Sequence, residues 1–93
     1  MNTADVAVLP EPTGSALIMV DGDGENQIVV CPGANSHLSL DGVEFSPEET
    51  VLCQLEVGLD VVLEVARKVS RFFVLNAAPA MDCRRSCWSG ATW

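Results

Sequence analysis

The side chains that could do chemistry in this chain begin with an acidic segment, Asp21-Gly22-Asp23-Gly24-Glu25. Its three carboxylates alternate with glycines, a pattern that invites comparison with a calcium-binding loop. A loop of the EF-hand type needs glycine at its sixth position and a bidentate glutamate at its twelfth. This sequence has Asn26 and Pro32 at those positions. We therefore predict a solvent-exposed turn and assign no metal ligand to the segment.

Cysteine and histidine do not provide a better catalytic or metal site. Cys83 and Cys87 have the spacing of half a zinc site, but no second pair follows, and the only histidine, His37, is remote in sequence. Cys31 and Cys53 lie in apolar runs, where a free thiol behaves as a small hydrophobic side chain. Nothing around the histidine resembles a nucleophile with its base, so we assign no catalytic residue.

Glu56 is the carboxylate whose place in the chain carries a specific physical argument. It follows residues 51–55, a short and mostly apolar run typical of a buried strand. Ligands of open α/β sheets bind beyond the carboxyl ends of the strands, where a carboxylate can accept hydrogen bonds from a polyhydroxylated ligand. The same argument applies with less weight to Asn76, after the next predicted strand. Position alone is equally consistent with a solvated acid at a strand end.

Two groups of predicted elements would position these side chains. Apolar runs at 14–20 and 27–31 flank the Gly/Asp/Asn cluster, which predicts an antiparallel β-hairpin. A strand at 51–55, a helix at 58–69 and a strand at 72–75 follow with short connections. This order predicts one parallel βαβ unit.

The predicted helix has one apolar and one charged face. Its apolar side chains recur at helical spacing and are expected to face the sheet: Leu59, Val62, Leu63, Ala66 and Val69. On the charged face, Glu64 precedes Lys68 by four residues, the favourable order for an ion pair. A single βαβ unit covers only one face of its sheet, so we expect apolar surface to stay exposed.

Charge and composition exclude several classes of function. The chain has 93 residues, enough for one small domain, and its 48% of hydrophobic residues indicates a folded core. Thirteen Asp and Glu against five Lys and Arg give a net charge of −8, which disfavours nucleic acid and anionic membranes as partners. The longest apolar run, residues 16–20, is too short to span a membrane. Because residues 1–5 carry no basic segment, we expect a cytoplasmic protein.

The composition changes abruptly after residue 81. Residues 82–93 contain both tryptophans and two of the four cysteines, but no Val, Leu, Ile or Phe. A true continuation of the domain would be expected to keep the hydrophobic pattern of the next helix. We therefore predict a partial domain at 1–81 and an unrelated tail at 82–93, which is disordered or translated in a shifted frame.

Five short motifs follow one another along residues 1–80: Thr13-Gly14-Ser15-Ala16-Leu17-Ile18, Asp23-Gly24-Glu25-Asn26, Pro32-Gly33-Ala34-Asn35, Leu52-Cys53-Gln54-Leu55-Glu56 and Leu75-Asn76-Ala77-Ala78-Pro79-Ala80. Each is weak alone. In this order and spacing, they resemble the middle of the ribokinases, in the PfkB family of carbohydrate kinases. The resemblance implies a ribokinase-like α/β fragment, with a lid hairpin at 14–31 and a βαβ unit of a mainly parallel sheet at 51–75.

The resemblance also implies a function, the ATP-dependent phosphorylation of ribose or a related sugar to the sugar 5-phosphate, with magnesium. By correspondence with the family, Glu56 would hydrogen-bond a sugar hydroxyl. Lid side chains that pack against the sugar would be Ala16, Ile18 and Val30, although the family commonly has a larger aliphatic residue at the last position.

Other features of the family set limits on this chain. Asn26 and Asn35 match family positions, where a structural role in the hairpin and a ligand contact both stay open. The family's catalytic base, its magnesium-organising Asn-x-x-Glu motif and its anion hole have no counterpart, so we expect no catalytic, cofactor-binding or metal-binding residue. The chain alone should be inactive and bind ATP and Mg²⁺ poorly. A homodimer through the lid hairpin is expected. The alternative is a non-catalytic module or remnant that pairs with a complete kinase subunit.

Overall fold

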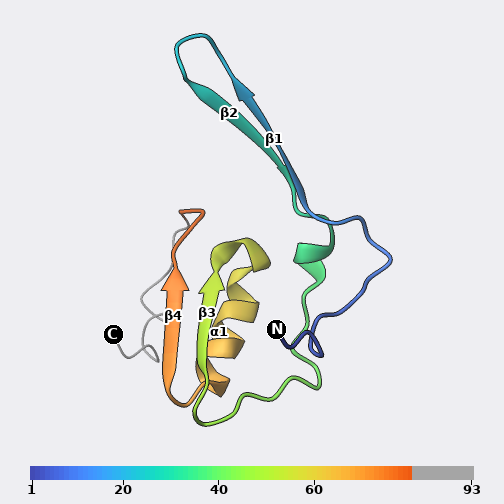
Figure 1. Ribbon diagram of the computed structural model, residues 1–93, viewed down its shortest axis with the longest axis vertical. Coiled ribbons are helices and arrows are strands. Elements are labelled where there is room, and N and C mark those ends of the chain that lie inside the picture. Colours follow the sequence, from blue (N-terminus) through green and yellow to red (C-terminus); the bar gives the residue numbers. More distant parts are fainter. Residues whose placement is uncertain (81–93) are drawn as a thin grey trace. The chain divides into compact units, whose positions relative to one another are not determined.

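The computed structural model describes residues 1–80 of the chain, which divides into two units, Met1–His37 and Leu38–Trp93 (Figure 1). Each unit is considered by itself. The predicted tail at 82–93, with Cys83 and Cys87, lies outside the described residues, so the domain boundary at residue 81 stays a prediction.

The first unit contains the hairpin predicted from the two apolar runs. Strands β1 (Ser15–Val20) and β2 (Asn26–Cys31) pair antiparallel, and the short 3₁₀ helix η1 (Gly33–His37) follows. Both strands begin and end within one residue of the predicted limits. Before β1 the chain is irregular, as its two closely spaced prolines require.

The acidic segment forms the turn of the hairpin, as predicted. One carboxylate oxygen of Asp21 accepts hydrogen bonds from the backbone N–H groups of Asp23, at 2.9 Å, and Glu25, at 3.0 Å. The backbone closes the turn through a bond from the N–H of Asp21 to the carbonyl of Glu25, at 3.0 Å. The carboxylate at the start of the segment is therefore used within the turn itself.

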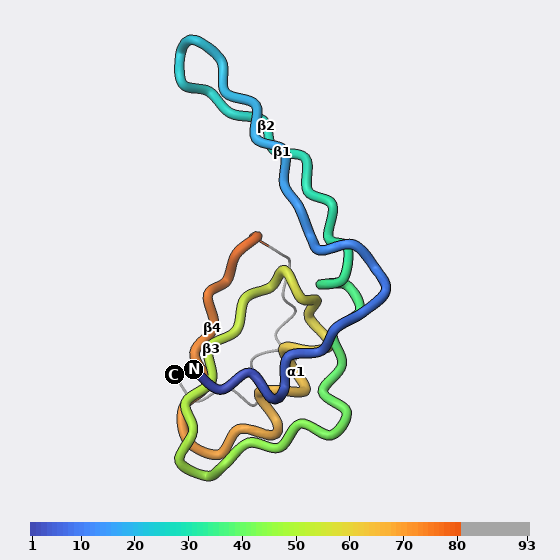
Figure 2. The backbone as a smooth tube through the Cα atoms, turned by 45° about the vertical axis from the view of Figure 1, so that its right-hand side comes forward, coloured from blue at the N-terminus to red at the C-terminus, as the bar shows by residue number. Residues whose placement is uncertain are grey.

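The second unit contains the predicted parallel βαβ arrangement. Strand β3 (Thr50–Gln54) leads through the 3₁₀ turn η2 (Leu55–Val57) into α1 (Leu59–Lys68), and β4 (Phe72–Asn76) returns beside β3. The two strands pair in parallel, and Figure 2 follows the crossover of the chain through α1. The fold class predicted from the sequence, a hairpin plus one βαβ unit, is confirmed.

The core of the second unit lies between α1 and one face of the β3–β4 sheet. Its buried side chains are Leu40, Leu55, Val62 and Val65. Two of these correct the sequence analysis. Val65 was not assigned to the buried stripe, yet it is only 3% exposed, because it lies one turn after Val62 on the same side of the helix. Leu40 belongs to the segment 32–50, in which the sequence analysis predicted no helix or strand.

The charged face of the helix is as predicted at its last turn. Lys68 Nζ lies 3.3 Å from Glu64 Oε1. The helix ends at Lys68, so Val69, expected in its apolar stripe, instead caps its carboxyl end in an extended conformation. Among residues 1–80, no helix is long and apolar enough to cross a membrane.

The other face of the sheet has no cover within the described residues of this unit. Burial alternates along both strands, and the positions turned away from α1 are exposed. Three of them are large apolar residues: Leu52 at 67%, Phe72 at 60% and Val74 at 47% exposed. This is the exposed apolar surface that a single βαβ unit was expected to leave.

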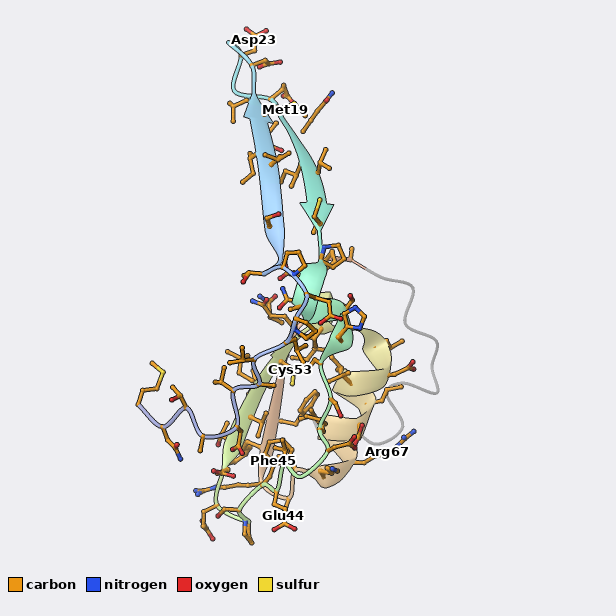
Figure 3. All side chains as sticks on the ribbon, turned by 90° about the vertical axis from the view of Figure 1, so that its right-hand side faces the viewer. Met19, Asp23, Glu44, Phe45, Cys53 and Arg67 are labelled. Atoms are coloured by element: carbon orange, nitrogen blue, oxygen red, sulfur yellow. The ribbon has the colours of Figure 1, made fainter. Side chains whose placement is uncertain are left out.

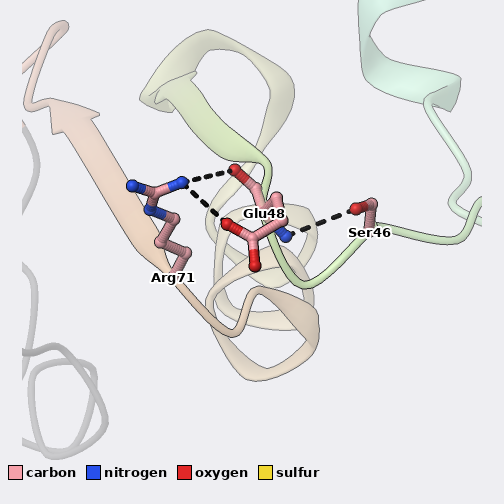
Figure 4. Close-up of polar contacts among 3 residues, drawn as sticks. All are labelled: Ser46, Glu48 and Arg71. Carbon is pink, nitrogen blue, oxygen red and sulfur yellow. Dashed lines mark hydrogen bonds and ion pairs between the residues drawn. The ribbon is translucent and has the colours of Figure 1, made fainter.

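An ion pair ties together the segments that enter the two strands. Arg71 Nη1 donates to the Glu48 carboxylate at 2.9 Å and lies 3.4 Å from the Glu48 carbonyl oxygen, while the Glu48 N–H donates to Ser46 Oγ at 3.3 Å (Figure 4). The guanidinium also lies 5.6 Å from the ring centre of Phe72. Both charged side chains are at least half exposed, so the pair adds little stability.

Candidate functional site

The hairpin offers two apolar faces, because its strands have almost no polar residues to alternate with the apolar ones. Directly paired residues of antiparallel strands lie on the same face. The face that we call the Ile18 face consists of Ala16, Ile18, Val20, Asn26, Ile28 and Val30. The opposite face, the Leu17 face, consists of Ser15, Leu17, Met19, Gln27, Val29 and Cys31.

All three lid residues implied by the family resemblance lie together on the Ile18 face. Ala16 pairs directly with Val30, and Ile18 follows two positions along β1. Ile18 is 60% and Val30 is 64% exposed, so both side chains are open to a ligand. Figure 3 shows side chains leaving the hairpin on both sides, with Asp23 at its tip and Met19 on the strand below. The three residues thus form one accessible apolar strip.

The two asparagines of the first unit have different surroundings. Asn26 begins β2 on the Ile18 face, opposite Val20. Asn35 lies in η1, at the base of the hairpin, with its side-chain amide close against Gly14. This close packing favours a structural role for Asn35.

Glu56 lies at the carboxyl ends of the parallel strands, in the second unit. It is the central residue of η2, two residues beyond the end of β3. The N–H of Leu55 donates to the carbonyl of Ala78 at 3.0 Å, which carries the pairing of the two chain segments past the strand ends. The predicted strand at 51–55 therefore ends one residue early, and Glu56 is held on a short turn between β3 and α1.

Gln54 is a polar residue of this edge that the sequence analysis did not single out. It is the last residue of β3 and pairs with Asn76, the last residue of β4. Both are exposed on the face turned away from α1. Gln54 is the polar residue of the otherwise apolar run 51–55, and this was the signal in the sequence that could have found it.

The edge can accept and donate hydrogen bonds but shows no sign of a metal site. Glu56 is exposed, and no other described residue donates a hydrogen bond to its carboxylate. Gln54 and Asn76 each add an amide that can both donate and accept. Within residues 1–80, no three His, Cys, Asp or Glu side chains lie together as metal ligands would.

Comparison with known proteins supplies the context for these residues. The chain is 38% identical over 81 residues to a ribokinase of Haemophilus influenzae, covering 78% of this chain and 26% of that protein. It is 35% identical over 77 residues to a ribokinase of Mus musculus, covering 74% and 24%. It is 33% identical over 90 residues to a deoxyribokinase of Salmonella typhi, covering 87% and 29%. This chain is of the ribokinase type.

The match to the ribokinases is partial in length. The chain spans about a quarter of the length of the curated relatives that it matches. No family model matches it. The ribokinase-type sequence coincides with an antiparallel hairpin and a parallel βαβ unit, the two features that the resemblance implied. The candidate residues fall into two groups: a strip on the hairpin in the first unit and a polar edge in the second.

Proposed function

We propose that these residues are part of the sugar site of a ribokinase-type kinase, which transfers a phosphoryl group from ATP to the 5-hydroxyl of ribose or a related sugar. The observation that carries the proposal is the strip of Ala16, Ile18 and Val30. These three residues share one exposed face of a hairpin whose sequence matches ribokinases. The names of the relatives, ribokinase and deoxyribokinase, support a sugar with five carbons.

In this proposal, each group of residues, within its own unit, offers the sugar a different kind of contact. The Ile18 face covers the apolar side of the ring and keeps water from the reacting hydroxyl. Glu56 accepts hydrogen bonds from hydroxyl groups, since its carboxylate is exposed and unengaged among the described residues. A hydrogen bond to a charged group contributes about 1.5–3 kcal/mol. Binding also costs the ligand its translational and rotational entropy, so a contribution of this size corresponds to a millimolar dissociation constant at best.

The chain alone is expected to hold a sugar weakly and to transfer no phosphoryl group. ATP and Mg²⁺ belong to the proposed reaction of the whole kinase, where the metal would neutralise charge on the transferred phosphoryl group. By the family resemblance, the residues that organise this metal have no counterpart in the chain.

A titration with ribose, followed by NMR on the full chain, tests the sugar site. Methyl signals of Ile18 and Val30 should shift, while the methyl signals of Leu17, on the opposite face, should stay in place. Glu56→Ala should weaken binding by about tenfold or more, because it removes the acceptor. Glu44→Ala is the matched control, an exposed acid of the same unit outside the strand ends. Equal shifts on both faces, or no effect of Glu56→Ala, would contradict the proposal.

An activity assay tests the expected inactivity separately. The purified chain with ribose, ATP and Mg²⁺ should show no phosphate transfer above background. Turnover that disappears in Glu56→Ala would mean that the chain completes an active site by itself. Turnover that survives the substitution would identify a contaminating kinase.

A second candidate role is pairing through the hairpin, with a second copy of the chain or with a complete kinase subunit. It rests on the Leu17 face, where Leu17 is 66%, Met19 54% and Val29 49% exposed. Sugar contacts on the Ile18 face would leave this second apolar face open to a partner. We infer a homodimer, formed by two Leu17 faces.

The charge of the hairpin makes this homodimer testable. Residues 1–37 contain five acids and no Lys or Arg, so two copies repel each other and salt should favour the dimer. Sedimentation should show a dimer that strengthens with salt and that Met19→Asp abolishes. Val20→Asp, on the Ile18 face, is the matched control and should leave the dimer intact. A monomer at all salt concentrations would refute this role.

A further inference from the structure

The hydrophobic pattern of the hairpin does not specify the register in which its strands pair. In the observed register, three direct pairs join two apolar residues: Ala16 with Val30, Leu17 with Val29 and Ile18 with Ile28. Met19 and Val20 face polar partners, Gln27 and Asn26. Moving β2 by one residue would give four apolar pairs: Ala16 with Cys31, Leu17 with Val30, Ile18 with Val29 and Met19 with Ile28. Side-chain pairing alone therefore favours the shifted register over the one observed.

A one-residue shift would change which side chains share a face. The side chains of a strand alternate, so each residue of β2 would move to the opposite face relative to β1. Val30 would leave Ala16 and Ile18 and join Leu17. The strip to which we assigned the sugar contacts would no longer exist. Something other than side-chain pairing must hold the observed register.

At the turn, the register is held by the Asp21 carboxylate. The same oxygen accepts both the Asp23 and the Glu25 N–H groups, which fixes the loop between the strands at residues 21–25. The Gly24 N–H adds a bond of 3.2 Å to the Asp21 carbonyl. A shifted register would lengthen the loop to 21–26 and would pull Glu25 away from these partners.

At the base, the register is held by a close crossing of the two chain segments that enter and leave the hairpin. The N–H of Ala34 donates to the carbonyl of Pro12 at 2.8 Å. A Cβ atom on Gly14 would lie 2.6 Å from Asn35 Nδ2 and 2.7 Å from the Pro32 carbonyl oxygen. Gly33 has a φ of +52°, and a Cβ atom there would clash with the Pro12 carbonyl. The crossing thus admits only glycine at both positions, and it aligns the strands from the end opposite the turn.

We propose that Asp21 and the Gly14–Gly33 crossing are positioning elements that lock the hairpin in register, so that Val30 lies on the same face as Ala16 and Ile18. The lock itself follows from the hydrogen bonds and close contacts of the first unit. Its importance for sugar recognition rests on the proposed function. These residues act on the ligand only through the side chains that they align.

The test reads the register directly, by NMR on the full chain without any sugar. The wild-type protein should show methyl–methyl contacts between Ile18 and Ile28, which share a face, and no methyl–methyl contact between Ile18 and Val29, whose side chains lie on opposite faces. Asp21→Ala should raise the shifted population by about tenfold or more, seen as a new contact between Ile18 and Val29, because two hydrogen bonds to a charged acceptor are lost. Asp21→Asn keeps the acceptor oxygen and should restore the wild-type contacts. Asp23→Ala is the matched control, since it removes an acid of the same turn that accepts neither bond.

Gly33→Ala provides a second variant at the other end of the hairpin and should produce the same new contact. Exclusive Ile18–Ile28 contacts in both Asp21→Ala and Gly33→Ala would overturn the proposal. The loss of all cross-strand contacts in both variants, without any contacts of the shifted register, would also overturn it. That result would mean that these residues stabilise the hairpin and do not select its register. A mixture of registers in the wild-type protein would also refute it. None of these readouts involves ribose, so the lock can succeed or fail independently of the sugar site.

Discussion

Replacing Leu55 with alanine should unfold the second unit at room temperature. Leu55 is 2% exposed and is the most deeply buried side chain of the core, which contains three other buried residues among residues 38–80. Removing a buried leucine side chain costs about 2–5 kcal/mol, including the cavity that it leaves. A unit of this size has a total stability of roughly 2–6 kcal/mol if it follows the usual scaling with length. The loss therefore equals most or all of what holds the unit together.

Leu52→Ala is the matched control, because it makes the same chemical change three residues earlier, in strand β3. Leu52 is 67% exposed on the open face of the sheet, so truncation should cost less than about 1 kcal/mol. Urea titrations followed by circular dichroism at the helix band would measure both variants. Helix α1 has ten residues, too few to be stable alone in water, so its signal reports docking onto the sheet. Equal effects of the two substitutions would refute the assignment of the core.

Two further predictions concern thiol reactivity and surface charge. Cys31 is exposed, whereas burial raises the pKa of the half-buried Cys53 thiol, so less of Cys53 is thiolate at neutral pH. Iodoacetamide should therefore label Cys31 about tenfold faster at neutral pH, and the Cys53 rate should keep rising into the alkaline range, as peptide mass spectrometry would show; equal rates would contradict this assignment. Glu64→Gln should cost no more than about 0.5 kcal/mol in low-salt urea titrations and nothing in high salt, because its ion pair with Lys68 is exposed; a larger cost would mean that the pair is more than a surface contact.

The secondary structure was predictable because each element carries its own local signal. The Gly/Asp/Asn cluster between two apolar runs specified the hairpin, and the helical spacing of apolar residues specified α1. The strand before Glu56 was placed correctly to within one residue. These signals depend on residues that are close in sequence, so they can be recognised without knowledge of the tertiary packing.

Properties set by tertiary packing were not predictable in the same way. Leu40 lies outside every helix and strand, close in sequence to the apolar residues Leu38 and Val43, and nothing local marks it as part of the core. Val65 lies between the exposed Glu64 and the half-buried Ala66, so the width of the buried stripe depends on how the helix sits on the sheet. In the candidate site, the resemblance gave Ala16, Ile18 and Val30, but that they share a face depends on a register that their apolar character does not determine.

The two sheets have a consequence for the behaviour of the chain in solution. Each sheet in the described residues has only two strands, so each of the four strands has one edge whose backbone groups lack a strand partner. Such edges are templates for intermolecular pairing, and no proline interrupts any of these strands. The net charge of −8 opposes that pairing through repulsion between molecules. Because salt screens this repulsion, pairing between molecules at the strand edges should increase with ionic strength.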